Sequence, residues 1–252
     1  MQEMNHWRMD RPDEDVADEV EGGELTHAEN MAGLPMRTYL PDSLVPGYPY
    51  PLLVMFHERG GNEEQVLRHV PRISSQNFVY LSLRGPEPLG RRADGKRGFG
   101  WAHRNAGLLS EYVELAVSLV RQTVQIHSER VYLVGVNEGA DAAYRAGFAL
   151  AGKVAGVIAL NGTMPQPTLG KPVFRFDDAR KLRVFMGHGV SNSEAIRRQT
   201  DKDYKVLYGC GADVQYQTYP TDQDLHAEMF RDVNRWIVGN VNAEHDMYAI
   251  RD

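Results

Sequence analysis

The chain has very few cysteines: Cys210 is the only one among 252 residues. A single cysteine cannot form an intrachain disulfide or a cysteine-based metal cluster, so a reducing compartment is expected. No apolar run approaches the roughly 18 residues that a membrane-spanning helix needs. Residues 1–10 contain no apolar segment of the kind that secretion signals carry. We therefore predict a cytoplasmic protein without a membrane partner.

The chain also lacks an excess of positive charge. Its net charge is −6 at pH 7, and residues 1–24 hold nine acids against two arginines, a local net charge of −7 that leaves the remainder at +1. This balance argues against nucleic acid as the main partner. We expect residues 1–29 to form an acidic, flexible N-terminal arm, with a docking arm anchored by Trp7 as the alternative. Residues 30–252 then form one domain.

Strand-like and helix-like patterns alternate along this domain. Six strand-like segments, most of them continuous apolar runs bounded by glycine or proline, comprise residues 51–56, 78–83, 130–135, 154–160, 183–187 and 214–219. Apolar residues at helical spacing mark residues 106–127, 138–150 and 228–238. The alternation predicts an α/β fold, with a mostly parallel central sheet and helices on both faces. In such folds, ligands bind outside the carboxyl ends of the strands.

Two strand ends carry glycine-rich turns. Gly135-Val-Asn137-Glu-Gly139 follows a strand and leads into an alanine-rich helix. Glycines at these positions allow a sharp turn that projects the central side chain above the sheet. With serine in place of Asn137, the segment would be a nucleophile elbow. An ordinary strand–turn–helix is the alternative. His57-Glu58-Arg59-Gly-Gly, after another buried strand, is similar to the loop that supplies an oxyanion-hole N–H.

Taken together, these loops resemble the α/β-hydrolase fold, and specifically the carboxylesterase/phospholipase family close to dienelactone-hydrolase-like esterases. Gly187-His188-Gly189 resembles the loop that carries the acid, and Arg84-Gly-Pro86 with Trp101 resembles the loop after a neighbouring strand. Residues 155–165 resemble the strand and loop between elbow and acid. The resemblance extends over about residues 34–240, with its motifs in the family's order.

The resemblance also implies a set of site residues. The backbone N–H groups of Arg59 and Glu138 would form the oxyanion hole. The pocket would be lined by His57, Glu58, Trp101 and His188. Glu58 occupies a position that is usually glycine, and its carboxylate would disfavour an oxyanion nearby.

The three catalytic positions of the family are all replaced. Asn137 stands at the nucleophile position, Asn192 at the acid position and Gln223 at the histidine position. An amide is not a nucleophile that a base can activate, it cannot stabilise an imidazolium by charge, and glutamine accepts no proton near neutral pH. We therefore predict a catalytically inactive pseudo-esterase that retains a ligand- or partner-binding pocket, in which Asn137 faces Asn192 and Gln223.

Two other functions stay open from the sequence. A hydrolase with weak or rearranged activity could use His226, three residues past Gln223, as its base, although a surface position is the plainer interpretation of that histidine. A purely structural or oligomeric protein would have a collapsed pocket. A metal site built from His57, His188 and His226 lacks the usual ligand spacing, so neither metal nor cofactor is expected.

The expected ligand is an ester-like or anionic small molecule. The basic segment 84–101 should overhang the pocket, where it could bind an anion or the acidic arm, or remain a solvated loop. The sequence is compatible with either a monomer or a homodimer.

Overall fold

The computed structural model describes residues 24–29, 35–92, 94–101, 106–167, 174–222 and 224–249. Its strands are β1 Glu24–Glu29, β2 Pro35–Leu40, β3 Tyr50–Phe56, β4 Val79–Leu83, β5 Glu87–Arg91, β6 Arg97–Gly100, β7 Ile126–Val136, β8 Gly156–Leu160, β9 Arg183–Gly189 and β10 Asp213–Tyr219. Its helices are α1 Glu63–Leu67, α2 Val70–Ile73, α3 Ala106–Arg121, α4 Gly139–Ala149, α5 Phe176–Ala179, α6 Glu194–Gly209 and α7 Ala227–Ala249.

Eight strands form one sheet in the order β1-β2-β4-β3-β7-β8-β9-β10. The run from β4 to β10 is parallel throughout, whereas β1 and β2 pair antiparallel at one edge. The predicted α/β class with a mostly parallel sheet is therefore confirmed. Because parallel strands share one direction, the loops after β3, β7, β8 and β9 meet at a single edge of the sheet.

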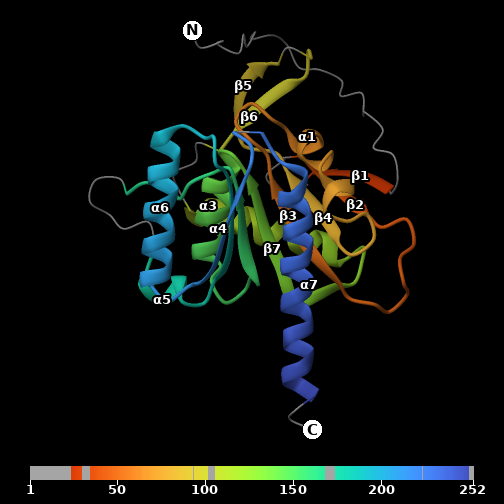
Figure 1. Ribbon diagram of the computed structural model, residues 1–252. Coiled ribbons are helices and arrows are strands. Elements are labelled where there is room, and N and C mark those ends of the chain that lie inside the picture. The colour runs from red at the N-terminus through yellow and green to blue at the C-terminus, as the bar shows by residue number, and fades with distance from the viewer. Residues whose placement is uncertain are drawn as a thin grey trace.

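Helices cover both faces of this sheet (Figure 1). Along β3, Leu52, Val54 and Phe56 contribute to one core cluster, while Leu53 and Met55 contribute to the other. Successive side chains of a strand point to opposite faces, so both faces need apolar residues, and this explains the continuous apolar runs. Helices α3, α4, α5 and α6 contribute to the first cluster, and α1, α2 and α7 contribute to the second.

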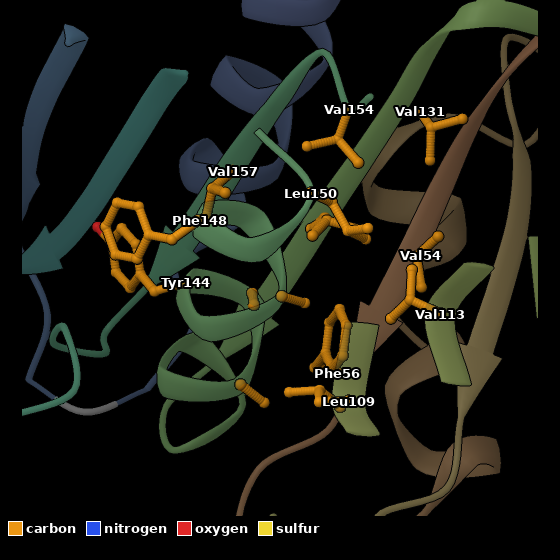
Figure 2. Close-up of a cluster of buried hydrophobic side chains, with 14 of the residues drawn as sticks. Val54, Phe56, Leu109, Val113, Val131, Tyr144, Phe148, Leu150, Val154 and Val157 are labelled. Carbon is orange, nitrogen blue, oxygen red and sulfur yellow. The ribbon is translucent and has the colours of Figure 1, made fainter. Parts of the chain in front are cut away.

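Helix α4, which follows the Gly-x-Asn-x-Gly turn, packs closely on the sheet. Figure 2 shows its Tyr144 and Phe148 beside Val157 of β8, and Phe56 of β3 beside Leu109 on the other side of the helix. The rings of Tyr144 and Phe148 stack with their centroids 6.0 Å apart. The alanines of α4 allow this close approach, so the start of the helix is held firmly above the central strands.

The basic segment 84–101 contains a two-stranded antiparallel hairpin, β5–β6. Phe99 bridges to Gly61 in the loop after β3. Three cations of the segment already have acidic partners: Arg84 pairs with Glu63, Lys96 with Glu64 and Arg92 with Asp94. Trp101 follows directly after β6.

The structure differs from the sequence prediction at several elements. The helix expected over residues 106–127 ends at Arg121, because Ile126 already pairs with Tyr50 as the start of β7. Helix α6 was not predicted, since its inward-facing positions include the buried polar residues Thr200 and Asp203. Strand β1 lies within the segment assigned to the acidic arm, and residues 1–23 lie outside the described residues. Among the described residues, no helix combines the length and hydropathy of a membrane span.

Candidate functional site

Asn137 lies in the turn between β7 and α4. Its φ of 50° is in the left-handed region, which asparagine tolerates better than most residues. Its N–H donates to the carbonyl of Leu160 at 2.8 Å, which holds the turn against β8. A Cβ on Gly139 would lie 2.2 Å from the carbonyl oxygen of Phe56, and one on Gly162 would lie 2.2 Å from that of Asn137. The predicted sharp turn is confirmed, and glycine is required for its close approach to neighbouring loops.

The loop after β3 begins with His57, which is only 1% exposed. Its Nε2 accepts the N–H of Gly85 at 2.9 Å, so the proton of the neutral ring belongs on Nδ1, which donates to the carbonyl of Glu58 at 2.7 Å. Burial lowers the pKa of His57 to about 4. Both ring nitrogens are thus engaged with backbone, and His57 fixes the loop rather than serving as a base.

The side chain of Glu58 connects this loop to the turn after β7. Its Oε2 accepts a hydrogen bond from Asn137 Nδ2 at 2.8 Å, and its Oε1 accepts one from Gln65 Nε2 at 3.2 Å. The next residues in the two loops, Arg59 and Glu138, form an ion pair, with the Arg59 guanidinium 3.3 Å from Glu138 Oε1. The N–H groups of Arg59 and Glu138 have no acceptor in the part of the chain that the structure describes. Their role as an oxyanion hole stays a prediction.

Asn192, which the sequence resemblance assigns to the acid position, is 3% exposed and lies after β9. Its Nδ2 donates to Asn161 Oδ1 at 3.3 Å, and the same oxygen accepts the N–H of Gly189 at 2.9 Å. Asn161 Nδ2 donates to the carbonyl of Asp224 at 3.0 Å. The side-chain amide of Asn161 therefore connects β8, β9 and the segment that precedes α7. Among the described residues, Asn192 and Asn137 make no hydrogen bond to each other, and the side chain of each is bonded to a different partner.

His188, at the end of β9, is also buried, with 3% of its surface exposed. Its Nδ1 lies 3.3 Å from Thr200 Oγ1, and that hydroxyl donates to the carbonyl of Ile196. Burial lowers the pKa of His188 to about 4. The ring packs against α6 instead of facing open space.

Two residues concern the base of a hydrolase mechanism: Gln223, at the expected histidine position, and His226, the alternative base. Gln223 lies outside the described residues. The His226 ring stacks on Tyr219 with the centroids 6.4 Å apart, and its Nδ1 accepts the N–H of Glu228 at 3.3 Å. No contact between His226 and Asn137 occurs among the described residues.

A cavity of about 610 Å³ opens over Asn137 at the carboxyl ends of the strands. This volume suits a small molecule. Its lining consists of Glu58, Arg59, Trp101, Asn137, Glu138, Asp141, Arg145, Asn161, Gly162, Thr163 and Ile196. Glu58 and Trp101 line it as expected. His57 and His188, expected to line it as well, do not, because both rings are buried in contacts with backbone or α6.

Comparisons with known proteins identify the architecture. No protein-family model and no curated protein matches the sequence. A carboxylesterase from Mesorhizobium loti superposes with a TM-score of 0.62 at 16% identity, over 85% of this chain and 99% of the other. The Bacillus cereus carboxylesterase gives 0.62 at 14% identity, over 83% and 95%. A fungal esterase structure from Rhizomucor miehei gives 0.67 at 11% identity, over 89% and 84%.

The chain has the α/β-hydrolase fold. In an α/β-hydrolase with esterase chemistry, the turn that Asn137 occupies carries the nucleophile. The cavity over Asn137 lies beside this turn. The part of its lining that the structure describes contains no serine, cysteine or histidine, and Thr163 is its only hydroxyl.

The α/β-hydrolase cavity is lined by several charged side chains. Arg59 pairs with Glu138, and Arg145 pairs with Asp141 through two nitrogen–oxygen contacts. Burial raises the pKa of Glu138, although the Arg59 guanidinium opposes that effect. The charges of the described lining are therefore largely organised in pairs. Among the described residues, no group of three histidine, cysteine or acidic side chains could hold a metal ion.

Three residues of this candidate site were not predicted from the sequence. Asn161 is its central amide, and Asp141 and Arg145 form part of the lining. The dipeptide Asn161-Gly162, directly after a buried strand, was a signal that could have identified Asn161. Asp141 and Arg145 lie one helical turn apart on α4, a spacing that is common on exposed helix surfaces and carries no comparable signal.

Proposed function

We propose that this protein is a catalytically inactive α/β-hydrolase, a pseudo-esterase that binds a small molecule in the cavity over Asn137. The observation that carries the proposal is the hydrogen bond from Asn137 Nδ2 to Glu58 Oε2. At the position where an esterase holds a serine activated by a base, this chain has an amide that donates to a carboxylate. Neither group can act as the nucleophile of a serine mechanism.

The histidines support the same proposal. Both ring nitrogens of His57 are hydrogen-bonded to backbone, and the His188 ring is packed on Thr200. The alternative, a hydrolase that uses His226, has less support, because that ring stacks on Tyr219 and is absent from the described lining of the cavity. A base has to reach its nucleophile to activate it.

Glu58 provides a further argument. Its carboxylate is bonded to Asn137, next to the Arg59 and Glu138 N–H groups of the expected oxyanion hole. A negative charge there opposes the oxyanion that ester hydrolysis develops. The volume of about 610 Å³ favours binding over the purely structural function, which predicts a collapsed pocket.

Two further expectations, one on ancestry and one on cellular location, belong to this proposal. Within the fold, we infer descent from dienelactone-hydrolase-like carboxylesterases on the strength of the loop motifs. A cytoplasmic location follows from the single cysteine.

The test of inactivity uses a fluorophosphonate probe and p-nitrophenyl acetate, with an active carboxylesterase as the positive control. Loss of a serine triad as a unit costs on the order of 10⁶ in kcat, so we expect no covalent labelling and no turnover above the buffer rate. Stoichiometric labelling of any serine would overturn the proposal in favour of a rearranged hydrolase.

The test of binding uses ligand-observed NMR with a library of small fragments. Thr163→Trp fills the cavity, and Thr218→Trp places the same bulk on the exposed edge strand β10 as a matched control. We expect the bound fragments to be lost in the first variant and retained in the second. Fragments that bind both variants equally would show that the cavity is not the binding site.

A further inference from the structure

Among the described residues, one acidic side chain of the cavity lining has no cationic partner. The part of the lining that the structure describes contains three acids and two arginines. Arg59 is paired with Glu138 and Arg145 with Asp141, which leaves Glu58 without an ion pair among the described residues. The described lining therefore carries one negative charge in excess.

The immediate contacts of Glu58 are neutral. Its two oxygens accept from the amides of Asn137 and Gln65. The nearby Arg92 donates to Gln65 Oε1 and to the carbonyl of Gly60, and it pairs with Asp94. A carboxylate offers about four lone-pair sites, and the two amides use two of them. Glu58 can thus accept further hydrogen bonds, and an ammonium group would also compensate its charge.

A separate observation concerns the other carboxylates of this region. Glu138 Oε2 and Glu87 Oε2 are both buried without a hydrogen-bond donor among the described residues. Glu138 lines the cavity, and the charge of Glu87 acts on it. Among the described residues, the region beside the cavity therefore has more hydrogen-bond acceptors than donors.

The aromatic residue of the lining fits the same chemistry. Trp101 Nε1 donates to the carbonyl of His57 at 2.9 Å, and its ring packs against those of His57 and Phe56 with centroids 5.0 and 5.1 Å away. These contacts hold the indole in one orientation at the cavity. The face of an indole attracts cations, and tryptophan does so better than the other aromatic side chains.

We propose that the cavity binds a small molecule bearing a protonated amine, which Glu58 and Glu138 recognise together with Trp101. An anion would instead meet two arginines that are already paired and a carboxylate that repels it. An ammonium group supplies three donors to a site that is short of them. This inference rests on the proposed binding function and assigns its ligand class.

The test compares three probes of nearly equal shape: benzylammonium, benzyl alcohol and benzoate. Affinities are measured by calorimetry at pH 7 and low salt, and the indole N–H resonance of Trp101, assigned with Trp101→Phe, reports the location. We expect benzylammonium to bind at least about tenfold more tightly than either other probe and to shift that resonance.

The variants are Glu58→Gln and Glu138→Gln, each neutral and nearly isosteric. Glu111→Gln, which removes an exposed acid of α3, is the matched control. We expect about a tenfold loss of benzylammonium affinity in Glu58→Gln and in Glu138→Gln, with no change in the control. Having two cavity variants keeps the test decisive if one of them fails to fold, as judged by its thermal transition.

The outcomes separate the two proposals. If benzoate or benzyl alcohol binds in the cavity more tightly than benzylammonium, or if neither cavity variant weakens benzylammonium, the ammonium proposal is overturned while a binding function stands. If no probe or fragment shifts the Trp101 resonance, both the ammonium proposal and the binding function are overturned. Catalytic inactivity is judged separately by fluorophosphonate labelling.

Discussion

The amide of Asn137 donates to the carboxylate of Glu58 at 2.8 Å, across 79 residues of sequence. The two residues belong to the loops that, in an esterase with this fold, carry the nucleophile and part of the oxyanion hole. The contact therefore joins two positions at which the sequence resemblance implies a replacement. A serine placed at residue 137 would still face Glu58, so restoring the nucleophile alone does not restore the site.

The first prediction concerns restoration of esterase chemistry. The triple variant Asn137→Ser, Asn192→Asp and Gln223→His should show weak esterase activity and slow labelling by a fluorophosphonate. Adding Glu58→Gly should accelerate labelling by about 10²-fold, the effect typical of an oxyanion-hole group. Asn137→Ser by itself should be inert, because triad members act as a unit. A folded quadruple variant that is not labelled would mean that the site has been remodelled beyond these four positions.

The second prediction concerns Asn192. Replacing it by aspartate puts a carboxylate oxygen opposite Asn161 Oδ1 at a buried position, and the donor of the 3.3 Å hydrogen bond is lost. Asn161 cannot reverse its amide without losing its bonds to Gly189 and Asp224. We expect Asn192→Asp to lower the free energy of unfolding by about 2–3 kcal/mol in urea titrations at pH 7.

The matched control for this change is Asn234→Asp. Asn234 Oδ1 accepts from Asn77 at an exposed site, and an aspartate can accept the same bond. Its unfolding free energy should stay within about 0.5 kcal/mol of the wild type. Equal losses of unfolding free energy in Asn192→Asp and Asn234→Asp would contradict the proposed cost of burying a charge beside Asn161.

The third prediction concerns the close approach of α4 to the loop after β3. A Cβ at residue 139 would lie 2.2 Å from the Phe56 carbonyl oxygen and 2.6 Å from that of His57. Gly139→Ala should therefore destabilise the fold by about 1–3 kcal/mol, through displacement of backbone. Gly209→Ala, at the end of α6 with no atom within 4 Å of the new methyl group, should be neutral or slightly stabilising. Thermal melts of the pair check this, and a tolerated Gly139→Ala would be inconsistent with the packing described.

The fourth prediction concerns pH. Burial lowers the pKa values of His57 and His188 from 6.5 to about 4, so both rings stay neutral in the folded protein while the unfolded chain takes up protons below pH 6.5. Stability should thus fall as the pH decreases from about 6.5 to 4. Each histidine should contribute up to about 3 kcal/mol to this loss.

Urea titrations at pH 7 and pH 4.5 measure this effect. His57→Gln and His188→Gln should each show a smaller difference between the two pH values than the wild type, whatever their stability at pH 7. His226→Gln changes a partly exposed ring and serves as the control. If both His57→Gln and His188→Gln kept the pH dependence of the wild-type unfolding free energy, these histidines would not be the cause of the loss of stability at low pH.

Local patterns predicted the central architecture well. The six strand-like segments correspond to β3, β4, β7, β8, β9 and β10. The first five are apolar runs because strands covered on both faces need apolar side chains, whereas β10 is a largely exposed edge strand with several polar residues. The sharp turn at Asn137 was predicted from its flanking glycines. Helix α6 was not predicted, since its buried positions include Thr200 and Asp203, which are satisfied by partners distant in sequence, such as His188 and Met164.

The sequence by itself determined the α/β class, the position of the site at the strand ends and the absence of serine from the turn after β7. These follow from side-chain periodicity, glycine at defined spacings and residue identity, all of which are local properties. Only the tertiary structure decided that Asn137 bonds Glu58, that Asn161 connects three segments and that His57 and His188 are turned away from the cavity. Those contacts join residues from different strand ends, and the packing of the sheet and its helices selects among the many partners that each polar side chain could have taken.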